Sequence, residues 1–100
     1  MMKKTAILVN VARGAVLDEA AVAEALLNGD LGGFGCDVYT SEPFGEDHPY
    51  TSILSQKNVI LTPHMAWGAY EARARCLDEI AENIRAFTTG GVRNRVDLDK

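Results

Sequence analysis

The sequence predicts an α/β fold built on a small parallel sheet. Three short apolar runs, at residues 6–9, 34–38 and 59–61, are separated first by a helix-compatible segment and then by a long irregular one. The runs are apolar without alternation, which is typical of strands covered on both faces. The order β-α-β-loop-β-α then favours a three-layer parallel sheet with right-handed crossovers. Three strands are few for such a sheet, so at least one edge is expected to lack a partner strand.

The first strand is expected over residues 5–11, and a helix follows it. Asp18 is a good N-cap residue, and Glu19 stands in the first turn, where the helix dipole favours an acidic side chain. The pair Asn28–Gly29 predicts a left-handed C-terminal end. The face expected to be apolar consists of Ala21, Val22, Ala25 and Leu26.

The second strand is expected to open at Gly32–Gly33 and to run through Val38. Glycines at positions 33 and 35 indicate close backbone approach there. Residues 40–56 form an irregular stretch that holds two of the three prolines. Loops of this length in a compact domain are usually functional or contain short helical turns.

The third strand is expected over residues 58–62, directly before Pro63, and a long helix over residues 68–89. Gly90–Gly91 is expected to end this helix. Its apolar side chains recur at three- and four-residue steps and form one stripe. The stripe consists of Ala74, Leu77, Ile80, Ala81, Ile84 and Phe87.

Composition limits the classes of function. The chain of 100 residues has a net charge of −4 and a pI near 5.0, so no basic surface for nucleic acid is expected. No apolar run reaches the roughly 18 residues of a membrane span, and no signal peptide is recognisable. Cys36 and Cys76 lack metal-ligand spacing and are interpreted as reduced thiols, with no metal site expected. We expect a soluble, cytoplasmic protein that binds neither nucleic acid nor membrane.

Three polar residues, Arg13, Glu42 and His64, each follow the end of one apolar run. In an open parallel sheet the loops after the strands lie at one edge, where ligands bind. A guanidinium, a carboxylate and an imidazole would therefore gather there. This combination suits an acid–base site that acts on an anionic substrate.

Taken singly, these residues also have ordinary interpretations. Arg13 could be a solvated turn residue, Glu42 a loop carboxylate and His64 the partner of a helix end. Asp37 differs, because it lies inside an apolar strand and a buried carboxylate is costly unless it is paired. His48 is interpreted as a loop residue and not as a second catalytic acid.

Three motifs give the chain a family resemblance. Residues 10–18 fit the pattern N-x-x-R-G-x-x-x-D, residues 35–43 contain D-V-x-x-x-E-P, and residues 61–64 contain T-P-H. The key positions of these motifs are 29 and 22 residues apart. In sequence and order the motifs resemble those of the D-isomer-specific 2-hydroxyacid dehydrogenases, and the likeness extends over residues 5–96.

The resemblance implies a role for each matched residue. His64 corresponds to the general acid that protonates the substrate carbonyl oxygen as a hydride arrives from reduced nicotinamide. Glu42 corresponds to the carboxylate bonded to this imidazole, and Arg13 to the residue that binds the 2-oxo acid. Asp37 corresponds to the carboxylate that holds the nicotinamide carboxamide. The implied cofactor-binding residues for NAD or NADP are Val11, Ala12, Arg13, Asp37, His64 and Ala66.

The same resemblance implies that residues 1–100 are the C-terminal part of a Rossmann-type NAD(P)-binding domain. The sequence contains no G-x-G-x-x-G, so the glycine-rich phosphate loop is missing, as is a substrate domain. Residues 64–67 and 47–49 are similar to the glycerate dehydrogenase, or hydroxypyruvate reductase, branch. Hydroxypyruvate or glyoxylate is therefore the expected substrate, in a parent enzyme that includes the missing N-terminal part.

Two alternatives remain open at this level. The chain could be a catalytically silent fragment, or a corepressor-like module of the same fold that serves protein association. Glu42 argues against the related formate dehydrogenases, which typically carry Gln at this position. We expect the isolated chain to be inactive and to form a homodimer, because its sheet edge and helix stripe would lack cover.

Overall fold

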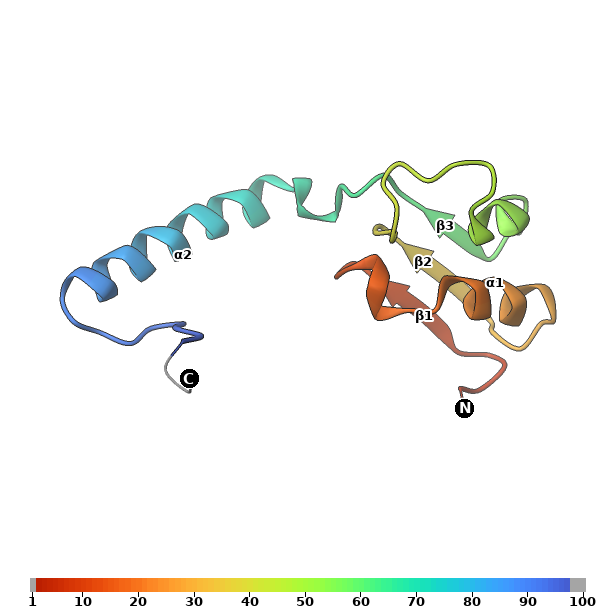
Figure 1. Ribbon diagram of the computed structural model, residues 1–100, viewed down its shortest axis with the longest axis horizontal. Coiled ribbons are helices and arrows are strands. Elements are labelled where there is room, and N and C mark those ends of the chain that lie inside the picture. The colour runs from red at the N-terminus through yellow and green to blue at the C-terminus, as the bar shows by residue number, and fades with distance from the viewer. Residues whose placement is uncertain (1, 98–100) are drawn as a thin grey trace. The chain divides into compact units, whose positions relative to one another are not determined.

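The computed structural model describes residues 2–97 and divides into two compact units, with the boundary between Ala66 and Trp67. Each unit is described by itself. The first contains the sheet and one α-helix, and the second contains the long C-terminal helix (Figure 1).

The first unit is built on three parallel strands in the order β1-β2-β3. The strands are β1 (Ile7–Asn10), β2 (Gly33–Cys36) and β3 (Val59–Leu61), and they lie side by side in Figure 1. The parallel α/β fold predicted from the sequence is confirmed. All three strands consequently end at the same edge of the sheet.

Helix α1 (Glu19–Leu27) follows β1 after a short 3-10 turn, η1 (Gly14–Val16). The predicted N-cap is confirmed, since Asp18 Oδ1 accepts a hydrogen bond of 3.0 Å from the amide of Ala21. The predicted left-handed end is also confirmed at Gly29, whose φ is 71°. The predicted apolar face is partly wrong, because Ala21 is exposed and the buried face begins two residues earlier, at the carboxylate of Glu19. The buried residues, spaced at i, i+3, i+4 and i+7, are Glu19, Val22, Ala23 and Leu26.

One face of the sheet carries the hydrophobic core. Helix α1 packs there beside a second 3-10 turn, η2 (Pro49–Ile53), which is the short helical turn expected in the irregular stretch. The ring of Phe34 on β2 meets Tyr50 of η2 edge-on, with centroids 5.2 Å apart. The core residues are Val22, Ala23, Leu26, Leu31, Phe34, Cys36, Tyr50 and Ile53.

The opposite face of the sheet is exposed, so the expectation that the strands are covered on both sides is wrong for this unit. Ile7 is 71% exposed and Ile60 69% exposed, and Val9 is similarly open. Gly33 and Gly35 lie between them on β2, beside the side chains of Ile7 and Val9. Among the described residues of this unit, α1 and η2 pack only on the sheet face that carries Phe34. The opposite sheet face is left as a shallow, exposed apolar surface.

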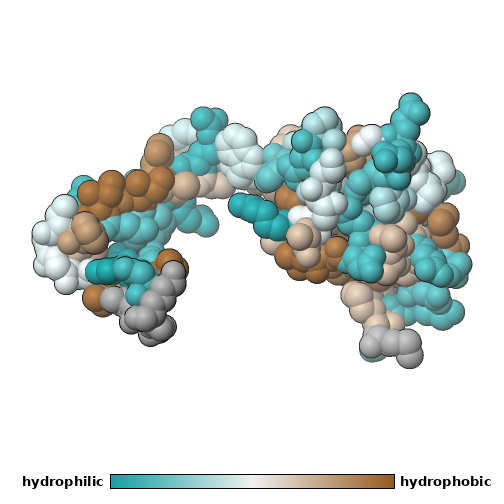
Figure 2. Space-filling model, viewed as in Figure 1, coloured by the Kyte–Doolittle hydropathy of each residue, from teal (hydrophilic) through white to brown (hydrophobic). Residues whose placement is uncertain are grey.

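The 3-10 turn η3 (Ala66–Gly68) spans the boundary, and the second unit contains helix α2 (Tyr70–Thr88). The helix is followed by Gly90, with φ of 78°, and Arg93 then binds Glu79 at 2.6 Å. The predicted apolar stripe is present, but no residue of α2 is buried, and hydrophobic surface runs along the helix in Figure 2. No helix within residues 2–97 has the length and apolar character needed to cross a membrane.

Candidate active site

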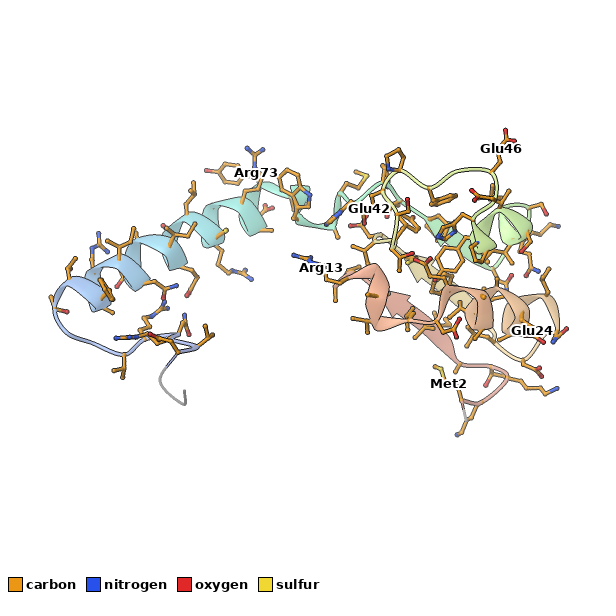
Figure 3. All side chains as sticks on the ribbon, in the orientation of Figure 1. Met2, Arg13, Glu24, Glu42, Glu46 and Arg73 are labelled. Carbon is orange, nitrogen blue, oxygen red and sulfur yellow. The ribbon has the colours of Figure 1, made fainter. Side chains whose placement is uncertain are left out.

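The turns after the three strands carry the polar residues singled out from the sequence. Arg13 follows β1, Asp37 and Glu42 follow β2, and His64 follows β3. Figure 3 shows Arg13 and Glu42 at this carboxyl edge, with the guanidinium of Arg13 pointing away from the sheet. The parallel topology therefore brings these turns to one edge, as predicted.

His64 and Glu42 form the central pair of this edge. The Nδ1 of His64 donates to Oε2 of Glu42 at 2.6 Å, and the amide of Tyr39 donates to Oε1 at 2.9 Å. The hydrogen bond from His64, followed by that from Tyr39, lowers the pKa of Glu42 below its ordinary value. Glu42 is thus an ionised acceptor at neutral pH, and it fixes a proton on Nδ1 of the imidazole.

The backbone of His64 adopts an uncommon conformation. Its φ is 53°, in the left-handed region that residues other than glycine rarely enter. The amide of His64 donates to the carbonyl of Thr62 at 3.1 Å, which makes a tight turn around Pro63. Residues held in this region cluster at functional sites, where the surrounding structure has to stabilise them.

Asp37 supplies that stabilisation. This carboxylate is 3% exposed. Its Oδ1 accepts from the hydroxyl of Thr62 at 2.6 Å and from the amide of Met65 at 2.8 Å, and its Oδ2 accepts from the amide of Ala66 at 2.9 Å. The Thr62 hydroxyl is the main cause of a pKa of Asp37 below the ordinary value. Asp37 thereby binds the turn on both sides of His64.

Asn10 organises the turn that carries Arg13. Its side-chain amide donates to the carbonyl of Arg13 at 2.9 Å, and its Oδ1 accepts from the amide of Ala12 at 3.1 Å. Arg13 is exposed, and its Nη1 donates to the carbonyl of Ala12 at 2.7 Å. The backbone is therefore fixed, while the guanidinium is presented to solvent.

Gly14 brings this turn against the segment that leads to Glu42. A Cβ at position 14 would lie 2.1 Å from the carbonyl carbon of Tyr39 and 2.3 Å from the amide nitrogen of Thr40. Only glycine fits this approach. Arg13 and Glu42 are consequently carried by backbones in direct contact.

Tyr39 connects the ends of β2 and β3. Its hydroxyl donates to the carbonyl of Thr62 at 2.7 Å and lies 3.0 Å from the carbonyl of Cys36. Burial raises the pKa of Tyr39 to about 12, so the hydroxyl keeps its proton and remains a donor. No sequence pattern predicted this contact, which joins residues 23 positions apart.

Two hollows flank the His64–Glu42 pair. One of about 450 Å³ is mainly apolar and is lined by Tyr39, Glu42, Pro43, Phe44, Leu54, Leu61, Thr62, Pro63 and His64. The other, of about 360 Å³, opens on the exposed sheet face and is lined by Val9, Val11, Gly35, Cys36, Asp37, Ile60, Thr62, Met65 and Ala66. Both lie within the first unit.

Comparison with known proteins assigns the family. Residues 1–66 match the family model described as D-isomer specific 2-hydroxyacid dehydrogenase, NAD binding domain. The chain belongs to this family. The resemblance carried by the three motifs is therefore confirmed.

Among curated dehydrogenases of the family, a glycerate dehydrogenase from Methylorubrum extorquens is 42% identical over 96 residues, which are 96% of this chain and 30% of the relative. A glyoxylate reductase from Thermococcus kodakarensis is 45% identical over 92 residues, 92% of this chain and 26% of the relative. A D-isomer specific 2-hydroxyacid dehydrogenase from Xanthobacter autotrophicus Py2, solved in complex with NADPH and MES, is 38% identical with a TM-score of 0.71. That match covers 96% of this chain and 38% of the solved one. The chain thus spans between about a quarter and two fifths of the length of these dehydrogenases.

The hollow on the exposed sheet face combines an apolar floor with a carboxylate, and a flat ring that carries a carboxamide, such as nicotinamide, could bind there. Its floor is apolar and flat, because Gly35 carries no side chain between Val9 and Ile60. Asp37 lies at its end, and a carboxylate has about four lone-pair positions, of which the three donors of the His64 turn use three. A carboxamide donor could use the remaining one.

Proposed function

We propose that this chain supplies the acid–base residues of an NAD(P)-dependent oxidoreductase that transfers a hydride between NAD(P)H and a small 2-oxo or 2-hydroxy acid. The hydrogen bond of 2.6 Å from His64 Nδ1 to Glu42 is the observation that carries this proposal. A carboxylate bonded to one ring nitrogen orients the imidazole and stabilises the imidazolium form. His64 would then deliver a proton from Nε2 to the carbonyl oxygen of the 2-oxo acid.

The other residues of the edge would bind and orient. The planar guanidinium of Arg13 suits the carboxylate of a 2-oxo acid, because it can donate two parallel hydrogen bonds. Asp37 would accept from the nicotinamide carboxamide. The cofactor, when bound, supplies the hydride. The proposed cofactor-binding residues are Val11, Ala12, Arg13, Asp37, His64 and Ala66.

The proposed substrates are hydroxypyruvate, with glycerate as its product, and glyoxylate. The names of two relatives, a glycerate dehydrogenase and a glyoxylate reductase, support this pair. The hollow beside Asp37 suits the nicotinamide of either NAD or NADP, because the two cofactors differ at the ribose and not at the reacting ring.

A chimeric enzyme tests the proposal. The 96 matched residues of this chain replace the corresponding region of the glycerate dehydrogenase from Methylorubrum extorquens. Oxidation of NADH or NADPH is followed with hydroxypyruvate and with glyoxylate. The chimera should turn over, and His64→Asn should lower kcat by about 100- to 10,000-fold, because it removes the proton donor. An active chimera that keeps its kcat after His64→Asn contradicts the assigned role.

We also propose that this chain, a partial NAD(P)-binding domain, works in association. The exposed side chains on the second sheet face, such as Ile7 and Ile60, and those of α2, such as Leu77 and Phe87, support this. In a complete dehydrogenase the N-terminal part would cover them, and in the isolated chain a second copy would do so as a homodimer. Sedimentation equilibrium at about 100 μM should detect a species larger than 10.8 kDa. A monomer at this concentration would contradict the proposed association. If the isolated chain is a dimer but the chimeric enzyme is inactive, the alternative of an association module is favoured.

A further inference from the structure

The first unit contains a second carboxylate–imidazole pair, formed by Glu19 and His48. His48 Nε2 lies 2.6 Å from Glu19 Oε2, the same separation as between His64 and Glu42. The two pairs differ in burial. The side chains of His48 and Glu19 are 6% and 8% exposed, whereas those of His64 and Glu42 are 40% and 35% exposed. The Glu19–His48 pair is thus part of the interior and not of the open edge.

Hydrogen bonds fix this pair in one arrangement. Glu19 Oε1 accepts from the amide of Thr40 at 2.8 Å, and Oε2 accepts from the Thr40 hydroxyl at 2.8 Å as well as from His48. His48 Nδ1 accepts from the amide of Tyr50 at 3.1 Å, so the ring proton resides on Nε2. Burial alone would raise the pKa of Glu19, but these donors bring it below the ordinary value, and the carboxylate is ionised.

The pair joins three parts of the chain that are distant in sequence. Glu19 is the first residue of α1, Thr40 follows β2, and His48 caps the N-terminus of η2. The segment between Thr40 and His48 is the one that carries Glu42. The ring of His48 also stacks on Phe44 of this segment, with centroids 4.4 Å apart and an interplanar angle of 28°. Residues 40–48 are therefore held at both ends by hydrogen bonds to Glu19 and near the middle by the stacking of Phe44 on His48.

We propose that Glu19 and His48 are positioning residues, which hold residues 40–48 so that Glu42 meets His64 Nδ1. Thr40 is the link, because the amide of Tyr39, directly before it, donates to Glu42. The importance of this positioning for catalysis depends on the function proposed above. The positioning itself is a property of this chain and can be measured without turnover.

The two histidines of the chain provide the readout, since His48 and His64 are its only imidazoles. Their hydrogen bonds require opposite tautomers, with the proton on Nε2 in His48 and on Nδ1 in His64. The nitrogen-15 chemical shifts of the ring nitrogens distinguish these tautomers. They are recorded on the full 100-residue chain at a pH high enough for both rings to be neutral.

Glu19→Gln is the main variant. It replaces one carboxylate oxygen with an amide donor, which opposes either His48 Nε2–H at the Oε2 position or the amide of Thr40 at the Oε1 position. In either orientation one bond that holds residues 40–48 is lost. His48→Phe keeps a ring beside Phe44 but removes the donor. Both variants should abolish the distinct Nδ1-protonated signal of His64 and give the shifts of a tautomeric mixture, as Glu42→Ala should do directly. The pKa of Glu42, read from its carboxyl carbon, should rise towards its ordinary value in Glu19→Gln and in His48→Phe.

Glu24→Gln is the matched control, because it removes the same charge from an exposed site on the same helix. It should leave His64 as in the wild type. An unchanged His64 signal in folded Glu19→Gln, or an equal loss in Glu24→Gln, overturns the proposal. If Glu19→Gln does not fold, Thr40→Val decides by the same criterion, since it removes only the hydroxyl bond of 2.8 Å. An inactive chimera with a Glu19-dependent His64 signal would reject the proposed function and retain the positioning.

Discussion

Replacement of Gly14 by Ala should separate the two turns that carry Arg13 and Glu42. The added Cβ would lie 2.1 Å from the Tyr39 carbonyl carbon, whereas ordinary contact begins at 3.4 Å, so the backbones have to part by at least 1.3 Å. Both neighbouring atoms belong to the main chain and cannot rotate away. Overpacking of this kind costs about 1–3 kcal/mol and sometimes more.

Urea unfolding followed by circular dichroism measures this loss. For a small unit with a slope near 1 kcal/mol/M, the midpoint should fall by about 1–3 M. Gly33→Ala is the matched control, because its Cβ would meet its nearest neighbours at 3.4 and 3.5 Å, and it should change the free energy of unfolding by less than about 1 kcal/mol. In the chimera, the same displacement of the segment that carries Glu42 exceeds the roughly 1 Å of misplacement that costs about 100-fold, so kcat should fall by about that factor or more. A wild-type midpoint for Gly14→Ala would refute the reasoning.

Three further predictions concern the pH dependence of stability, the binding of substrate and the binding of cofactor. The pKa of Asp37 is lowered, chiefly by the Thr62 hydroxyl, so its stabilising contribution is present above the pKa of the unfolded chain and lost as pH falls through the lower folded value. When the pH is lowered from about 7 to about 3, the urea midpoint of unfolding should therefore fall less in Asp37→Asn than in the wild type. An equal fall in both proteins would contradict this. In the chimera, Arg13→Lys should raise KM for hydroxypyruvate more than it lowers kcat, because a point charge cannot replace the planar fork, and an unchanged KM would exclude Arg13 from binding. The isolated chain should not reduce hydroxypyruvate, and calorimetry should give a Kd for NADH weaker than about 10 μM, since tighter binding requires about 7 kcal/mol or more without a phosphate loop.

The local features of this fold could be predicted from the sequence because short-range rules determine them. Asp18 caps α1 and Gly29 ends it as expected, and the parallel order of the strands follows from the alternation of elements. That order also brings His64 and Glu42 to one edge, where they form a hydrogen bond. The family resemblance then implied that Glu42 would be bonded to His64.

The long-range features could not be predicted. An apolar run shows that both sides of a strand are apolar, but it does not say whether anything packs on each side, so the exposed face with Ile7 and Ile60 was missed. Glu19 was interpreted only as an acidic residue of the first turn, and His48 as a loop residue, yet they meet in the interior across 29 positions. An irregular segment has no period from which such a contact could be inferred.

The three donors bound to Asp37 determine how the turn around His64 can open. The amides of Met65 and Ala66 lie outside any strand, yet both bind one buried carboxylate. Hydrogen exchange at these amides requires their release from Asp37, so the turn should open as one cooperative unit and not fray residue by residue. The protection factors of Met65 and Ala66 should then be similar to each other, and they report the free energy with which the chain keeps His64 in its left-handed conformation.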